Sequence, residues 1–169
     1  KILQGIATFK PKISKEDVIV FYYYISRFYF GSGDFKKSLE YINKVLNDNE
    51  ANLRQDIFAF SRIINLFIHY ELKNYDLLDY IIKSTLRYLK KKNYEYRFEL
   101  TIIKHIKRLV KVHQYEKEVH NTLEEFKREI DQLFVDPYEQ VTIEYFDVLS
   151  WINSKMQGIS LAEYKKRSV

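Results

Sequence analysis

The chain has 169 residues, of which 46% are hydrophobic, and it carries a formal net charge of +5. This size suits one domain, or a short array of repeats, with a buried core. The absence of cysteine excludes disulfides and thiolate metal sites. With only 4 glycines and 2 prolines, the chain has too few turn residues for an all-β fold.

Hydrophobic runs in the sequence are short. A membrane helix needs ~20 consecutive apolar residues, whereas the richest run, 18–30, contains Arg27. We therefore expect no membrane contact and, since no signal peptide is visible, a cytoplasmic location. Because the chain starts at Lys1 and not at Met, we expect a fragment of a longer protein, in which any targeting segment would precede Lys1.

The first predicted helix begins after Ser14, which supplies an N-cap with an acid three residues on. It is expected to end at Gly31-Ser32-Gly33. Asp34 then caps a second helix, which ends at the polar run 47–49. The expected buried face of the first helix consists of apolar residues spaced three and four apart: Val18, Phe21, Tyr22, Ile25, Phe28 and Tyr29.

Four further helices follow in the middle and C-terminal parts of the chain. A third covers about 50–72, and Asn74 caps a fourth that continues to about 92. A fifth begins after Asn93 and ends near Gln114. The sixth, which follows this break, has apolar residues that alternate four and three apart, as in a coiled-coil seam.

The seventh helix has the clearest start. The segment 136–139, Asp-Pro-Tyr-Glu, places a cap, a proline at the first helical position and a capping glutamate in register. We expect one continuous helix from there to Gly158, and Ser160 caps a short last helix. The sequence therefore predicts an all-α chain of about seven helices plus a short C-terminal helix.

The first two helix pairs repeat each other at an offset of 40 residues. Gly33-Asp34-Phe35 in the first turn corresponds to Lys73-Asn74-Tyr75 in the second. The apolar positions after each turn also match, since Ile42 corresponds to Ile82. A helix–turn–helix repeat of this size predicts antiparallel pairs stacked as an α-solenoid.

The first pair resembles the tetratricopeptide repeat. The consensus positions are filled by Tyr22, Ser26 and Tyr29 on the first helix, Gly33-Asp34-Phe35 at the turn, and Ser38, Tyr41-Ile42 and Val45 on the second helix. Small residues such as Ser26 and Ser38 let the two helices approach each other. Val45, and Leu66 and Leu78 in the second pair, depart from the small residues of the family.

The resemblance implies one tetratricopeptide-like domain over 1–169. Residues 14–92 form two helix pairs and 94–167 form further C-terminal helices. The whole pattern also resembles the C-terminal part of bacterial tetratricopeptide-like proteins. A composition rich in Lys, Asn and Ile and poor in Ala is typical of an AT-rich bacterial genome.

The resemblance also implies a concave groove, lined by the first helix of each pair, that binds a protein or peptide partner. Mapped onto this sequence, the groove residues are Tyr23, Arg27, Phe30, Ile63, Phe67 and Tyr70. Exposed aromatics with one arginine suit an amphipathic helix or an extended peptide. The alternative is that these rings pack against an upstream repeat or against the C-terminal helices.

A basic stretch over 83–111 precedes an acidic one over 114–147. The candidate basic patch consists of Lys90, Lys91, Lys104, Lys107, Arg108 and Lys111. Such a patch suits a phosphate backbone, which makes nucleic-acid binding the alternative function. We favour the interpretation that the basic helix pairs with the acidic helix after it.

No catalytic motif is present. His113, Glu116 and His120 are spaced three and four apart, as metal ligands on one helix would be, but the predicted break near Gln114 argues against a metal site. We expect no enzyme activity, no metal and no cofactor. The predicted function is a non-catalytic protein-interaction or scaffolding module, whose partner is another protein, a peptide or a second copy of the chain.

Overall fold

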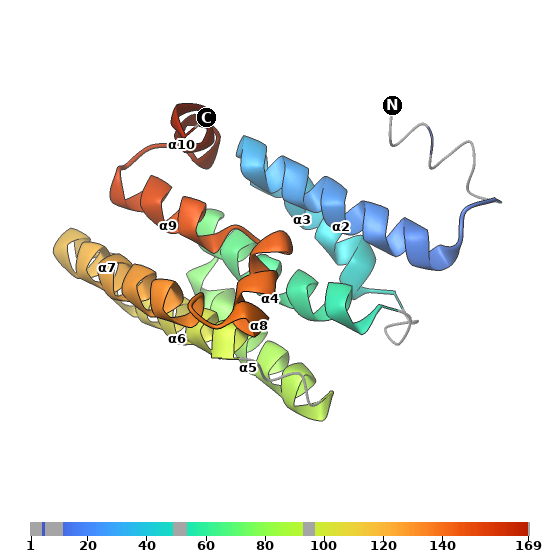
Figure 1. The fold of residues 1–169 in the computed structure, drawn as a ribbon, viewed down its shortest axis with the longest axis horizontal. Coiled ribbons are helices and arrows are strands. Elements are labelled where there is room, and N and C mark those ends of the chain that lie inside the picture. Colours follow the sequence, from blue (N-terminus) through green and yellow to red (C-terminus); the bar gives the residue numbers. More distant parts are fainter. Residues whose placement is uncertain (1–4, 6–11, 49–53, 93–96, 169) are drawn as a thin grey trace.

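The computed structural model describes Gly5 and residues 12–48, 54–92 and 97–168, in which every regular element is a helix. Three antiparallel pairs follow one another (Figure 1): α2 (Lys15–Ser32) with α3 (Phe35–Leu46), α4 (Gln55–Glu71) with α5 (Tyr75–Lys91), and α6 (Arg97–Val112) with α7 (Glu116–Leu133). The C-terminal segment comprises α8 (Pro137–Gln140), the 3-10 helix η2 (Val141–Glu144), α9 (Val148–Met156) and α10 (Leu161–Arg167). The predicted all-α class of stacked helix pairs is confirmed.

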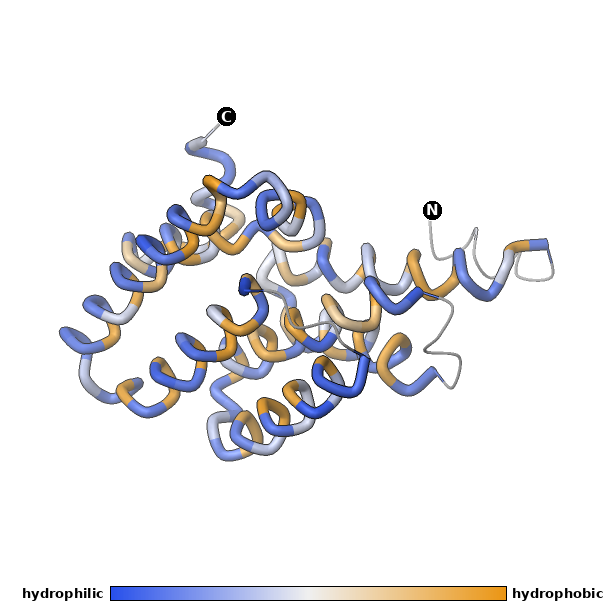
Figure 2. Tube along the Cα trace, turned by 60° about the horizontal axis from the view of Figure 1, so that its bottom comes forward, coloured by the Kyte–Doolittle hydropathy of each residue, from blue (hydrophilic) through white to orange (hydrophobic). Residues whose placement is uncertain are grey.

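The helix α4 lies at the centre of the fold. Of its 17 residues, 12 are buried, because it packs against α2, α3, α5 and α6. A helix that is apolar almost all round belongs in the middle of a core. Hydrophobic and hydrophilic residues alternate along the outer helices in Figure 2, as expected for helices with one solvent face. In the described part of the chain, no helix is long and apolar enough to span a membrane.

Two serines set the close approach of α2 and α3. Ser26 and Ser38 are fully buried. The hydroxyl of Ser26 donates to the carbonyl of Ser38 at 2.8 Å, and that of Ser38 donates to the carbonyl of Ser26 at 2.9 Å. These reciprocal bonds satisfy hydroxyls that would otherwise be buried without a partner. The prediction that small residues occupy this crossing is confirmed.

The turns after α2 and α4 share one backbone conformation. Gly33 has φ +84° and Lys73 has φ +58°. In both turns this residue and the next donate their N–H groups to carbonyls three and five residues earlier: Gly33 to Phe30 at 3.1 Å, Asp34 to Tyr29 at 3.0 Å, Lys73 to Tyr70 at 3.0 Å and Asn74 to His69 at 3.0 Å. This is the Schellman pattern of a helix end. The predicted correspondence of the two turns is confirmed.

Replacing Lys73 by glycine should stabilise the protein by about 1 kcal/mol, because a side chain in the left-handed region costs ~1–2 kcal/mol and glycine avoids most of it. Urea unfolding measures the change. Gly33→Lys is the matched control and should cost about as much, since a Cβ at Gly33 meets no atom within 4 Å and only the φ angle opposes it. Equal stability of Lys73→Gly and the natural protein would contradict the prediction.

The predicted continuous seventh helix is wrong. Its start is as expected, since Asp136 accepts the N–H of Tyr138 at 2.9 Å with Pro137 at the first helical position. The chain then leaves the helix between η2 and α9, where Asp147 caps a new helix by accepting the N–H of Ser150 at 3.1 Å. The predicted starts of the third and fifth helices, near 50 and 93, lie outside the described residues.

Candidate protein-binding surface

The six predicted groove residues do not line an open groove. Tyr23, Phe30, Ile63 and Phe67 are at most 2% exposed, whereas Arg27 and Tyr70 are partly buried. The prediction of exposed rings on this face is therefore wrong, and the physical reason is that the chain's own C-terminal segment covers them.

Two aromatic residues of the C-terminal segment fill this face. Phe146 packs against Phe30 and Phe67, with ring centroids 5.5 and 4.5 Å apart. Trp151 packs against Phe67 and Tyr70 at 4.8 and 5.7 Å. The alternative interpretation, that the groove rings pack against C-terminal helices, describes this arrangement.

Polar contacts lock the same segment to α2. The Tyr23 hydroxyl donates to the carbonyl of Tyr145, and Arg27 donates to the carbonyl of Glu144, each at 2.7 Å. These carbonyls are free to accept because the helix breaks at this point. Burial raises the pKa of Tyr23, so its hydroxyl remains a donor.

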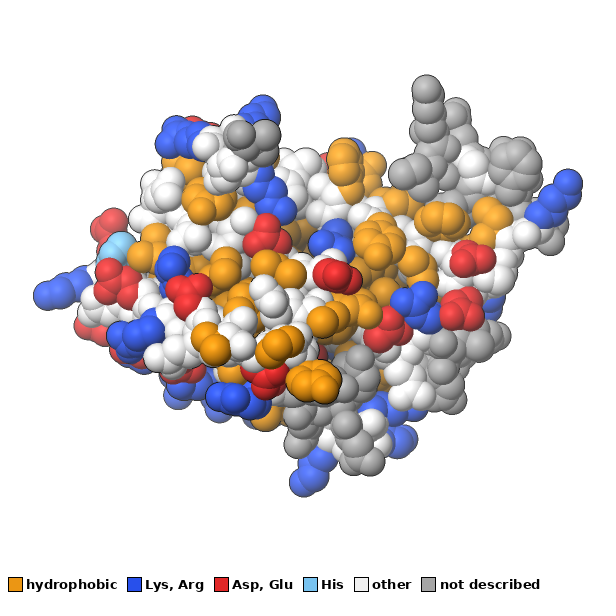
Figure 3. Space-filling view, in the orientation of Figure 1, with side chains coloured by type: hydrophobic (Ala, Val, Ile, Leu, Met, Phe, Trp, Pro, Cys, Tyr) orange, Lys and Arg blue, Asp and Glu red, His pale blue; other side chains and the backbone are white. Residues whose placement is uncertain are grey.

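The outer side of α2 carries an exposed row of rings. Phe21, Tyr24 and Phe28, the α2 aromatic face, are 38%, 53% and 72% exposed. Their spacing puts them on one side of the helix, and Figure 3 shows hydrophobic side chains gathered in a band along α2. Phe21 and Phe28 were predicted to be buried, so the sequence-based choice of the inner face was wrong.

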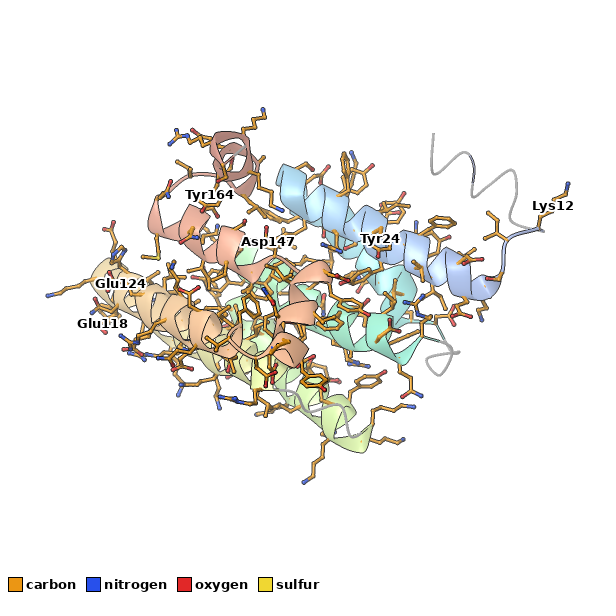
Figure 4. The ribbon with its side chains drawn as sticks, viewed as in Figure 1. Lys12, Tyr24, Glu118, Glu124, Asp147 and Tyr164 are labelled. Carbon is orange, nitrogen blue, oxygen red and sulfur yellow. The ribbon has the colours of Figure 1, made fainter. Side chains whose placement is uncertain are left out.

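A cleft of about 370 Å³ adjoins the α2 aromatic face, between α2, the start of α9 and α10. Its lining includes Tyr24 on α2 and Asp147 just before α9, both labelled in Figure 4. Lys165 reaches Asp147 at 3.3 Å. Burial disfavours the charged carboxylate, but hydrogen bonding from Ser150 and the nearby Lys165 ammonium lower the pKa of Asp147. The cleft therefore combines apolar walls with an ion pair.

Part of the basic patch is neutralised by α7. Lys104 lies 2.6 Å from Glu129, and Arg108 is paired with Glu125, which confirms the predicted pairing of basic and acidic helices. The other four cations of the patch, Lys90, Lys91, Lys107 and Lys111, are exposed. Within the described ranges, none of these four has an ion-pair partner.

The candidate metal ligands do not come together. The helix breaks where predicted, so His113 follows the end of α6 and Glu116 begins α7. His113 bonds the carbonyl of Val110 at 2.7 Å, and His120 lies 3.3 Å from Glu124. Among the residues that the structure describes, no group of three or more His, Asp or Glu side chains is placed to hold a metal ion.

Comparison with known proteins found no matching family model, no matching curated protein and no matching solved structure. Functional inference for this chain therefore rests on its own surfaces. Sequence reasoning missed the α2 aromatic face because α2 carries rings on all sides. The one usable signal was the run Phe21 to Tyr24, whose four consecutive rings cannot all point into one core.

Proposed function

We propose that this protein is a non-catalytic protein-binding module that contacts its partner through the α2 aromatic face and the adjoining cleft. The observation that supports this function is the exposure of three rings in helical register on one helix. Contiguous exposed apolar surface of this kind is typical of interaction sites. Aromatic side chains and arginine, here Arg27 at the cleft, are also the residue types that dominate interface energies.

The geometry favours an α-helix as the partner element. A row at positions i, i+3 and i+7 offers ridges along α2 against which the apolar stripe of an amphipathic helix packs. The cleft beside Tyr24 accepts one further side chain. Arg27 and Lys165 at its wall already contact the carbonyl of Glu144 and the carboxylate of Asp147, so the apolar part of the lining favours an apolar side chain there.

A photoreactive phenylalanine analogue at position 28 should form covalent adducts with a second protein in the cells that make this chain. Tyr80, on α5, is 65% exposed and provides the matched position for the control. Adding Tyr24→Ser should reduce the adduct yield from position 28 by about tenfold, since interface rings carry much of the binding energy. Adducts are measured by gel mobility and mass spectrometry.

The variant must leave the fold intact, which an unchanged thermal midpoint for Tyr24→Ser establishes. An adduct with twice the mass of the chain would identify the partner as a second copy. The proposed surface would be refuted by equal adduct yields from positions 28 and 80. It would also be refuted if the yield from position 28 did not change when Tyr24→Ser is added.

Nucleic-acid binding is the second candidate. The exposed Lys107 and Lys111 lie one turn apart on α6, and neither has an ion-pair partner in the described part of the chain. Because Lys104 and Arg108 are already paired with α7, this basic surface is smaller than the sequence predicted. A gel shift at low salt that disappears in Lys107→Glu would favour this function over the first.

We also propose that the first two helix pairs are of the tetratricopeptide type. The matched turns at Gly33 and Lys73 and the buried serine pair at the α2–α3 crossing support the assignment. The pairing of α6 with α7 continues the antiparallel stack but contributes no consensus residues.

A further inference from the structure

We infer that the seam between α4 and α5 binds a phosphate group through Arg62. Arg62 lies on α4 and is half-buried. Its Nε is enclosed and has no hydrogen-bond partner in the described part of the chain, whereas its two terminal nitrogens are not enclosed. The terminal nitrogens of the guanidinium are therefore accessible to solvent, whereas Nε is buried between α4 and α5.

No carboxylate neutralises this guanidinium in the residues that the structure describes. Burial lowers the pKa of Arg62, and this effect is opposed by the nearby Tyr88. A partly buried arginine normally has an anionic partner, because desolvating its charge is costly. The missing partner is the first sign of an external anion.

Tyr88, on α5, forms the opposite wall. The guanidinium carbon of Arg62 lies 4.4 Å from the centre of the Tyr88 ring, an arrangement that fixes the plane of the guanidinium. The Tyr88 hydroxyl is also enclosed without a partner. Burial raises the pKa of Tyr88, so the hydroxyl keeps its proton and can donate it to an anion.

A second pair of polar groups lies one turn along the seam. Asn65 follows Arg62 by three residues on α4, and Thr85 precedes Tyr88 by three on α5. In an antiparallel pair, the register that puts Arg62 opposite Tyr88 also puts Asn65 opposite Thr85. Asn65 is 8% exposed and Thr85 is 1% exposed, and the side-chain oxygen of each has no hydrogen-bond partner.

Four unpartnered polar groups in one seam are unusual. Each lowers the stability of the fold when it is left unsatisfied, and such groups in folded proteins mark functional sites or bound species. Of these groups, Arg62 and Tyr88 lie side by side and can both donate hydrogen bonds, and Arg62 carries a positive charge. An anion satisfies these donors and neutralises the charge, which water cannot do.

The number of donors favours phosphate over a carboxylate. A carboxylate has two oxygens, which the two terminal nitrogens of one arginine can occupy fully. A phosphate group offers a further acceptor oxygen for the hydroxyl of Tyr88, whose ring lies beside the guanidinium. This site lies on α4 and α5, apart from the α2 aromatic face. The result of its test therefore does not depend on whether the proposed protein-binding function is correct.

Inorganic phosphate should bind the natural protein, and the Arg62→Met variant should bind it at least about tenfold more weakly, since hydrogen bonds to charged groups are strong. Phosphate is titrated into the protein in exchange for chloride, so that the ionic strength stays constant. Binding is measured by the change in the NMR chemical shift of the Arg62 Nε–H. Arg87→Met is the matched control, because Arg87 is an exposed arginine on the same helix pair and its loss removes the same charge.

A second variant and a second ligand complete the experiment. Tyr88→Phe keeps the ring but removes the hydroxyl, so it should weaken phosphate binding without unfolding the chain, which covers the case in which Arg62→Met does not fold. Comparing the affinity for a phosphoserine peptide with that for inorganic phosphate shows whether the site prefers a phosphate group attached to a peptide or free phosphate. Unchanged phosphate affinity in Arg62→Met or in Tyr88→Phe, an equal loss in Arg87→Met, or equally tight acetate binding would overturn the proposal.

Discussion

Glu99→Gln should make the protein more stable at neutral and alkaline pH, by about 3 kcal/mol near pH 7. Glu99, in the first turn of α6, is 0% exposed, and neither of its carboxylate oxygens has a hydrogen-bond partner in the described residues. Burial, aided by the nearby carboxylate of Glu139, raises the pKa of Glu99 from 4.5 to about 8. Folding therefore forces this group to hold a proton.

The sign of the effect follows from the direction of this shift. A carboxyl whose pKa is higher in the folded state does not lower the free energy of unfolding at a pH below its unfolded pKa of 4.5. Stability then falls as the pH rises, until the folded carboxyl ionises at about 8. Each pH unit within this window costs about 1.4 kcal/mol. Glutamine has a similar shape but cannot ionise, so the variant loses this dependence.

Urea unfolding at about pH 5, 7 and 9 tests the prediction. The stability difference between Glu99→Gln and the natural protein should be small at the lowest pH and should widen up to about pH 8. The matched control is Glu118→Gln, because Glu118 lies exposed on α7 (Figure 4) and the same substitution there alters no buried carboxyl. Parallel stability curves for Glu99→Gln and the natural protein would show that Glu99 does not titrate in this way.

Local signals predicted the elements well. Ser14 and Asp34 accept backbone N–H groups at the starts of α2 and α3, as expected. The pairing of α6 with α7 also followed from the sequence, since opposite charges on consecutive helices need only a short connection to meet. In each case the interaction partners lie close together in the chain.

The features that the sequence did not predict depend on contacts between segments far apart in the chain. Glu139 was expected to cap its own helix, but its carboxylate accepts the N–H of Phe98 at 3.1 Å and so caps α6. On α2, rings on every side give no periodic contrast, so the inner face is chosen by the C-terminal segment that covers Tyr23 and Phe30. The position of the α2 aromatic face could not be predicted because it depends on this choice.

Phe146→Ala should destabilise the protein by about 3–5 kcal/mol, because it leaves a cavity in a well-packed aromatic cluster. Phe146 is 4% exposed and fills the space between Phe30 and Phe67 at the break before α9. The chain has 1 tryptophan, Trp151 on α9, so its fluorescence reports on this segment alone. Urea unfolding followed by that fluorescence and by circular dichroism measures the loss.

Phe28→Ala is the matched control, since Phe28 is 72% exposed and its loss should change stability by no more than about 0.5 kcal/mol. The fluorescence and circular dichroism transitions should stay together in Phe146→Ala, because Trp151 still packs against Phe67 and Tyr70. If Phe146→Ala costs no more than Phe28→Ala, the Phe146 ring does not hold the C-terminal segment against α2 and α4.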